Sequence, residues 1–173
     1  NIKDTKIAVR VFKRCISIAG DELHPNHAYA KKYLAVAAKN DLLFKLADEE
    51  KVTLFGISAK YIDSLMNKEV IPKKNHDLSS LRTICSTGSP LSKDGFKYIY
   101  NKIKKDVHLS SISGGTDIIS CFVLGNLFQP VYAGEIQNRG LGMDVDIFDE
   151  QGSSINNKKG ELVCKTPFPS MPI

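Results

Sequence analysis

Apolar and polar positions in the middle of the chain follow two different periods. Apolar residues spaced three and four apart predict three helices, each beginning after a residue that can cap it: Asp41, Ser58 and Ser92. Short apolar runs predict three strands, at 52–55, 81–86 and 107–112. Helices and strands therefore alternate over this part of the chain, which is typical of a parallel sheet covered by helices.

The pattern changes after residue 117, where an alternation typical of strands replaces the helical period. Residues 118–124 are apolar and strand-like, and residues 134–138 are a shorter candidate. Residues 143–149 alternate strictly, and a polar loop separates them from 161–165, their expected antiparallel partner. The fold class that we expect is α/β, with a partial parallel sheet and covering helices followed by a β-rich segment.

Composition indicates an ordinary globular protein with an uneven charge. Of its 173 residues, 42% are hydrophobic and 25% are charged, which excludes a mainly disordered chain. The net charge of +5 arises entirely from residues 1–40, whereas residues 41–173 are neutral overall. We interpret this excess as a solvated face or tail, because a nucleic-acid surface needs clustered cations.

The chain also lacks the signs of a membrane or secreted protein. No apolar run approaches the roughly 20 residues that a membrane-spanning helix needs. The four cysteines are widely separated and form no C-x-x-C pair. Both observations favour a cytoplasmic protein with reduced thiols.

Two polar loops follow the second and third predicted strands and are the candidates for chemistry. The first reads Ser-Thr-Gly-Ser-Pro at 86–90, and the second reads Ser-Gly-Gly-Thr-Asp at 113–117. Ligands of open α/β sheets bind at the carboxyl ends of the strands, where consecutive strands would bring both loops together. Glycines expose backbone N–H groups to phosphate, hydroxyls donate hydrogen bonds, and a carboxylate can hold magnesium on phosphate. The residues alone thus predict a nucleotide-type pocket, although ordinary turns use the same residue types.

These features divide the chain into three parts. Residues 1–40 form an unassigned basic segment, and residues 41–125 form a partial α/β subdomain that carries the nucleotide pocket. We expect residues 126–173 to form a β-rich segment that is truncated.

Several stretches of the chain resemble the adenylate-forming acyl-CoA ligases, and among them the ligases that act on acetoacetate. The resemblance begins at about residue 42 and covers roughly three quarters of the chain. The stretches agree with the family in order and spacing: FGISAKYI (55–62), HDLSSLR (76–82), STGSPL (86–91), the run 104–125, GEIQNRGLG (134–142) and GELVCKTPFPSMPI (160–173).

The resemblance implies a fragment of the large N-terminal domain of an adenylate-forming enzyme. Such an enzyme joins the carboxylate of acetoacetate to the α-phosphate of ATP and releases pyrophosphate. CoA then displaces AMP to give acetoacetyl-CoA, so the implied cofactors are ATP, Mg²⁺ and CoA. The implied partners are these small molecules and acetoacetate, with no nucleic acid.

The resemblance also implies roles for the residues of the two loops. Thr116 would bond the phosphate and Asp117 would take the magnesium position, which makes these two the implied catalytic residues. The residues implied to contact the nucleotide are Gly88, Ser89, Pro90, Ser113, Gly114, Gly115 and Thr116. The family usually has an aromatic residue where this chain has Ser113 and a glutamate where it has Asp117.

Two parts of the family pattern find no match in this sequence. One is the phosphate loop that ends in Pro-Lys, and the other is the C-terminal domain with its catalytic lysine. We therefore expect the chain to be inactive alone and its partners to include the missing parts of the same enzyme. Two alternatives stay open: a non-catalytic nucleotide-binding or interaction remnant, and a nucleic-acid binder that depends on residues 1–40.

Overall fold

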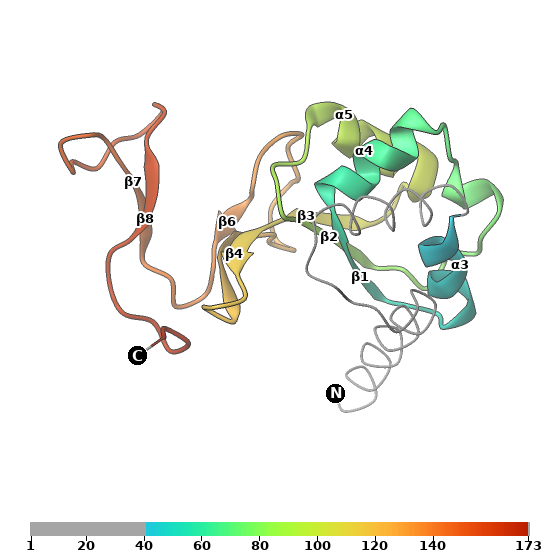
Figure 1. Ribbon diagram of the computed structural model, residues 1–173, viewed down its shortest axis with the longest axis horizontal. Coiled ribbons are helices and arrows are strands. Elements are labelled where there is room, and N and C mark those ends of the chain that lie inside the picture. Colours follow the sequence, from blue (N-terminus) through green and yellow to red (C-terminus); the bar gives the residue numbers. More distant parts are fainter. Residues whose placement is uncertain (1–40, 173) are drawn as a thin grey trace, which may run out of the picture.

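The computed structural model describes residues 41–172, so the basic segment 1–40 lies outside the described residues. The first sheet contains three parallel strands in the spatial order β1 (Leu54–Ser58), β2 (Thr83–Thr87) and β3 (His108–Ser111). Its helices are α3 (Leu42–Glu49), α4 (Ala59–Asn67) and α5 (Lys93–Tyr98), with a 3-10 turn η1 (Pro72–Lys74) and a π-helical continuation of α5, η2 (Ile99–Ile103). Figure 1 shows α4 and α5 side by side over the sheet. The expected parallel sheet with covering helices is confirmed.

The core lies between this sheet and its helices. Fully buried apolar side chains of this core come from α3, α4, α5, η2 and the two strands β2 and β3, and include Phe44, Tyr61, Ile62, Leu65, Ile84, Phe96, Ile99, Ile103 and Leu109. Burying one side chain of this kind contributes about 1.5–3 kcal/mol. The core therefore fixes the register of β2 against β3, in which Ile84 pairs with Leu109 and Ser86 with Ser111.

Two of the three expected helix caps are present. Ser58 Oγ accepts a hydrogen bond of 3.1 Å from the Tyr61 amide, and Ser92 Oγ accepts one of 3.1 Å from the Gly95 amide. Each cap satisfies an amide that has no partner within its own helix.

The expectation that the Asp41 side chain caps α3 is wrong. Asp41 adopts a left-handed backbone conformation with φ of 44° and makes no side-chain cap. Its carboxylate instead accepts a hydrogen bond of 3.1 Å from Asn75 Nδ2 and lies 3.2 Å from His76 Nε2. The buried carboxylate thus ties the start of α3 to the loop after η1, because a buried charge needs partners of this kind.

The second half of the chain is built from antiparallel strands. One sheet has the order β4 (Ser113–Gly115), β5 (Ser120–Leu124) and β6 (Asn138–Arg139), and β7 (Val145–Phe148) pairs with β8 (Glu161–Cys164). In Figure 1 this β-rich part extends away from the α/β part, with β7 and β8 at the far end. The expected pairing of 143–149 with 161–165 is confirmed, whereas only the last residue of 134–138 belongs to a strand. The division of the chain at residue 126 stays a prediction.

The second candidate loop is in part a strand. Ser113–Gly115 form β4, and only the turn of residues 116–119 separates β4 from β5. A Cβ atom on Gly114 would overlap the Ser120 carbonyl oxygen and lie 2.7 Å from Cys121 Cα. The glycine at position 114 therefore allows the two strands to approach.

Among residues 41–172, no helix is long and apolar enough to cross a membrane.

Candidate functional site

A pocket of about 450 Å³ lies where the carboxyl ends of β2 and β3 meet the antiparallel sheet. Its lining residues come from three parts of the chain: Thr87, Gly88, Ser89, Pro90, Leu91, Ser111, Ile112, Ser113, Gly114, Val123, Gly134, Ile136 and Leu162. A volume of this size is within the range of small-molecule sites. The two candidate loops therefore face a common cavity, as the order of the parallel strands predicts.

The first wall is the loop that follows β2. Gly88 has a φ of +82°, a conformation that other residues adopt only with strain, and a Cβ built on it would meet no atom within 4 Å. The backbone at Gly88 is thus open to a ligand. Thr87 and Ser89 on either side place hydroxyl groups along the same wall, where each can donate or accept a hydrogen bond.

The second wall is formed by the end of β3 and the beginning of β4. Ser111 is only 8% exposed, while Ser113 and Gly114 are exposed to the cavity and solvent. Ile112 donates its amide to the Ser86 carbonyl over 2.9 Å, which holds this wall to β2. The hydroxyl groups of Ser111 and Ser113 are therefore carried by backbone that is bonded to the parallel sheet.

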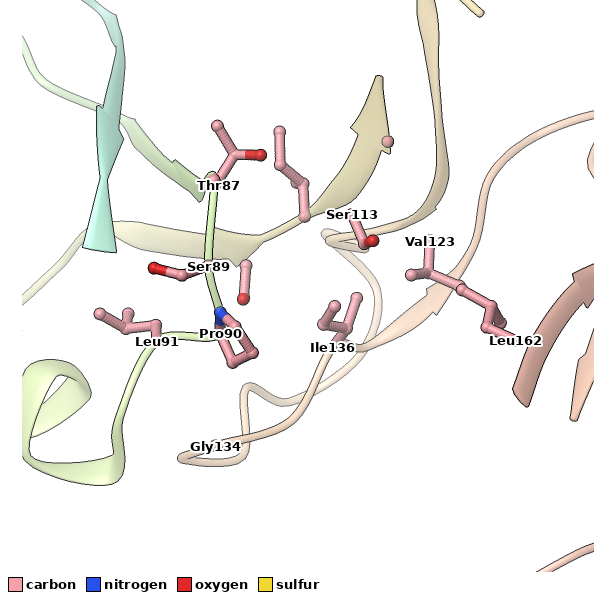
Figure 2. A pocket seen from close by; sticks show the side chains of 13 residues that line it. Thr87, Ser89, Pro90, Leu91, Ser113, Val123, Gly134, Ile136 and Leu162 are labelled. Carbon is pink, nitrogen blue, oxygen red and sulfur yellow. The ribbon is translucent and has the colours of Figure 1, made fainter. Parts of the chain in front are cut away.

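The third wall is apolar and comes from the β-rich half. Figure 2 shows Ile136 between Pro90 on one side and Val123 with Leu162 on the other. Ile136 is 37% exposed and Leu162 is 39% exposed, so both present apolar surface to the cavity. The pocket thus joins two hydroxyl-bearing walls to an apolar wall, a combination suited to a ligand with a flat apolar part and a polar part.

The sequence-predicted site residues fall into two groups. Gly88, Ser89, Pro90, Ser113 and Gly114 all line the pocket. Gly115, Thr116 and Asp117 are not among the lining residues.

Thr116 and Asp117 begin the exposed turn between β4 and β5. A Cβ built on Gly115 would lie 3.5 Å from Asp117 Oδ1, so that carboxylate lies beside the end of β4. Among the described residues no cluster of three metal-ligating side chains exists. One carboxylate of this kind suits a Mg²⁺ ion that is carried mainly by phosphate and water, rather than one enclosed by protein.

Reasoning from the residues missed the walls that come from distant parts of the chain. Val123, Ile136 and Leu162 read in sequence as ordinary apolar residues. The stretches 104–125, 134–142 and 160–173, which resemble the ligases, contain all three and are the signal that these segments matter.

The Cys85 thiol on β2 has a raised pKa. Cys85 is on β2 directly before Ser86, and partial burial is the main reason that its pKa is raised. The neighbouring Cys121 acts in the same direction, while a hydrogen bond with Ser110 opposes it. Cys85 is therefore held as a neutral thiol, which is typical of a packing residue rather than a nucleophile.

Comparison with solved structures defines the class of protein. The chain is similar to acetoacetyl-CoA synthetase from Streptomyces lividans, with a TM-score of 0.70 and 38% identity over 76% of this chain and 21% of that one. It also shares the fold of the anthranilate CoA ligase AuaEII in complex with anthranoyl-AMP, with a TM-score of 0.61 and 19% identity over 74% of this chain and 24% of that one. The fold is that of part of an adenylate-forming CoA ligase.

Comparison of sequences narrows this class. The chain is 55% identical over 133 residues to acetoacetyl-coenzyme A synthetase of Rhizobium meliloti and 48% identical over 132 residues to acetoacetyl-CoA synthetase of Mus musculus. These matches cover 77% and 76% of this chain and 20% of each relative, so the chain spans about a fifth of their length. No family model matches it. The chain is related to the acetoacetyl-CoA synthetases.

Proposed function

We propose that this chain supplies the nucleotide-binding walls of an ATP-dependent ligase that joins acetoacetate to CoA. The observation that carries the proposal is the pocket in which the two candidate loops meet. The relationship to the acetoacetyl-CoA synthetases supports acetoacetate as the acid. The substrates would be acetoacetate, ATP and CoA, and the protein would act in the cytoplasm.

In this proposal the adenine ring lies against Gly88, Ser89 and Pro90. The open backbone at Gly88 favours close approach of a flat ring, and the apolar side chain of Ile136 faces the same space. The nucleotide then runs along Ser113 and Gly114 towards the turn after β4. An extended chain advances roughly 3.3 Å per residue, so Thr116, in the turn two residues after Gly114, lies at most about 7 Å from it, a short step for the phosphates of a bound nucleotide.

The reaction would proceed in two displacements. A carboxylate oxygen of acetoacetate attacks the α-phosphorus of ATP, and the bond from that phosphorus to the pyrophosphate oxygen breaks. The thiol sulfur of CoA then attacks the acyl carbon, loses its proton and releases AMP. The Thr116 hydroxyl would donate to the α-phosphate, and the Asp117 carboxylate would hold phosphate-bound Mg²⁺, which lowers the charge of the phosphates.

We also propose that the chain does not complete this reaction alone. It spans a fifth of the length of its relatives, and Thr116 and Asp117, the residues proposed to act on the phosphates, lie in an exposed turn that is not part of the pocket lining. Adenylate chemistry needs a site that excludes water, because water competes with CoA for the acyl-adenylate. The remaining walls would come from the other parts of a ligase of this kind.

The test is acetoacetate-dependent exchange of labelled pyrophosphate into ATP. The chain is measured alone and with a second polypeptide, the Rhizobium meliloti relative from which the 133 matched residues have been deleted. Exchange only in the mixture supports the proposal. Exchange by the chain alone would contradict its dependence on other parts.

A substitution pair identifies the site within the same assay. Asp117→Asn should reduce complemented exchange at least about tenfold, because it removes the charge proposed to hold Mg²⁺. Glu150→Gln makes the same chemical change in the exposed turn after β7 and should leave exchange unchanged. Absence of exchange from correctly folded pieces would favour the non-catalytic alternative, which calorimetric binding of AMP to the chain would then identify.

A further inference from the structure

The Gln137 side chain, which is not part of the pocket lining, makes five polar contacts with described residues. Its Nε2 donates to three backbone carbonyls, those of Asn126 at 2.9 Å, Gln129 at 2.8 Å and Pro130 at 3.2 Å. Its Oε1 accepts from the Asn126 amide at 2.9 Å and lies 3.1 Å from His108 Nε2. One amide group therefore closes the loop that runs from β5 to β6.

The partners determine the direction of the bond to His108. Three carbonyls surround the nitrogen of the Gln137 amide, so its oxygen is the end that faces His108. An amide oxygen only accepts, so His108 Nε2 must carry a proton and donate it. His108 belongs to β3, and the bond therefore anchors the loop to the parallel sheet.

The same loop carries a wall of the pocket. Ile136 directly precedes Gln137 and lines the cavity together with Gly134. The wall is also held near its other end, because Val131 packs against the core of the α/β part. Two anchors, Val131 and Gln137, thus enclose the residues that face Pro90 across the cavity in Figure 2.

A second contact from β3 ties down the beginning of this loop. The Gly125 amide donates to Ser110 Oγ over 2.9 Å. A Cβ on Gly125 would lie 2.5 Å from that oxygen and 2.8 Å from His108 Cε1, so the backbone passes directly over both side chains. His108 and Ser110 therefore contact this loop at its two ends, Gly125 and Gln137, while Ser111 on the same strand lines the pocket.

We propose that Gln137, together with His108, is a positioning residue that fixes Gly134–Ile136 at the mouth of the pocket and so sets its width. Gln137 is not among the residues that line the pocket and acts through the backbone that it holds. The geometry makes this role independent of the identity of the ligand. Only its effect on affinity rests on the proposed nucleotide site.

The primary test is amide hydrogen exchange of the full chain without any ligand. Gln137→Met keeps the length of the side chain and removes all five polar contacts. Loss of these bonds opens the loop locally, so exchange in 126–137 should accelerate about tenfold or more. Gln151→Met makes the same change in the exposed turn between β7 and β8 and should have no effect.

A second variant separates positioning from packing. Gln137→Glu retains the acceptor oxygens but loses the donor that three carbonyls share, and at pH 8 its charge repels them. At pH 5 a fraction of this carboxyl regains a proton and with it one donor. Relative to wild type at the same pH, acceleration should be smaller at pH 5 than at pH 8, a dependence that mere loss of packing would not produce.

The outcomes keep the two proposals apart. Accelerated exchange at 134–136 with unchanged exchange in β1, β2 and β3 supports the positioning role, and unchanged exchange at 134–136 in Gln137→Met overturns it. AMP titrated into the same proteins should bind about tenfold more weakly to Gln137→Met than to wild type. If wild type binds no AMP, the nucleotide site is refuted while the exchange data still decide the role of Gln137.

Discussion

A pair of glycine substitutions tests whether the backbone at the pocket is held in a conformation that only glycine adopts without strain. Gly88 and Gly56 share one property, since a Cβ built on either meets no atom within 4 Å. They differ in backbone, because Gly88 has a φ of +82° whereas Gly56 lies within β1 and has no such angle. Replacement by alanine therefore adds the same methyl group to open space in both places.

The expected difference follows from two opposing terms. Alanine restricts the unfolded chain and stabilises a protein by about 0.4–1 kcal/mol wherever the native backbone suits it. The left-handed region costs a residue with a Cβ about 1–2 kcal/mol. Gly56→Ala should thus be slightly stabilising, and Gly88→Ala should be less stable than Gly56→Ala by about 1–2 kcal/mol.

Urea unfolding followed by circular dichroism measures this difference. With a slope of about 1–3 kcal/mol per molar urea, a difference of about 1–2 kcal/mol separates the two midpoints by roughly 0.3–2 M. Equal midpoints would refute the left-handed backbone at Gly88. If the midpoints differ as expected, AMP titrated into both variants should bind more weakly only to Gly88→Ala, whose methyl group enters the pocket lining.

Three further predictions concern other parts of the structure. Lys104 Nζ donates to the carbonyls of Leu78, Ser79 and Leu81 at 2.7–2.9 Å. Lys104→Met should therefore lower the free energy of unfolding by about 2 kcal/mol in a urea titration. Lys105→Met, the control, should leave it unchanged. Ser92→Ala should cost about 1 kcal/mol in the same titration by removing the cap of α5, and Ser92→Gly only a few tenths. Hydrogen bonds from Ser79 and then Lys51 lower the pKa of Asp77 to about 2, so its contribution to stability is present above pH 3.8 and is lost as the pH falls towards 2. Thermal unfolding between pH 5 and 2 should therefore show a steeper loss for wild type than for Asp77→Asn, and parallel curves would contradict this.

The sequence predicted the α/β part well because its signals are local. Ser58 and Ser92 cap helices through bonds to residues three positions along the chain, and helix periodicity follows from neighbours of the same kind. The prediction that Asp41 caps α3 failed because the contacts of its side chain are not local. Its partners are Asn75 and His76, 34 and 35 residues away, and no local pattern reports them.

The sequence predicted the two walls of the pocket that follow β2 and β3, but it did not predict the apolar wall. Parallel strands in consecutive order bring their carboxyl ends to one edge, so the loops after β2 and β3 had to meet. The apolar wall depends on where β5, β8 and the β5–β6 loop pack. That placement rests on contacts such as the one between Gln137 and His108, separated by 29 residues.

The glycines of the second loop show why residue type alone does not assign a role. Gly114 and Gly115 suit a phosphate-binding loop, yet the structure uses Gly114 to let β4 approach β5. Both uses need the absence of a Cβ, and the sequence does not distinguish them. A close approach between strands also places Ser113 at the pocket, because the register change between Ser113 and Gly114 turns the strand there. The close packing at Gly114 and the position of Ser113 in the pocket lining are therefore consequences of one local geometry.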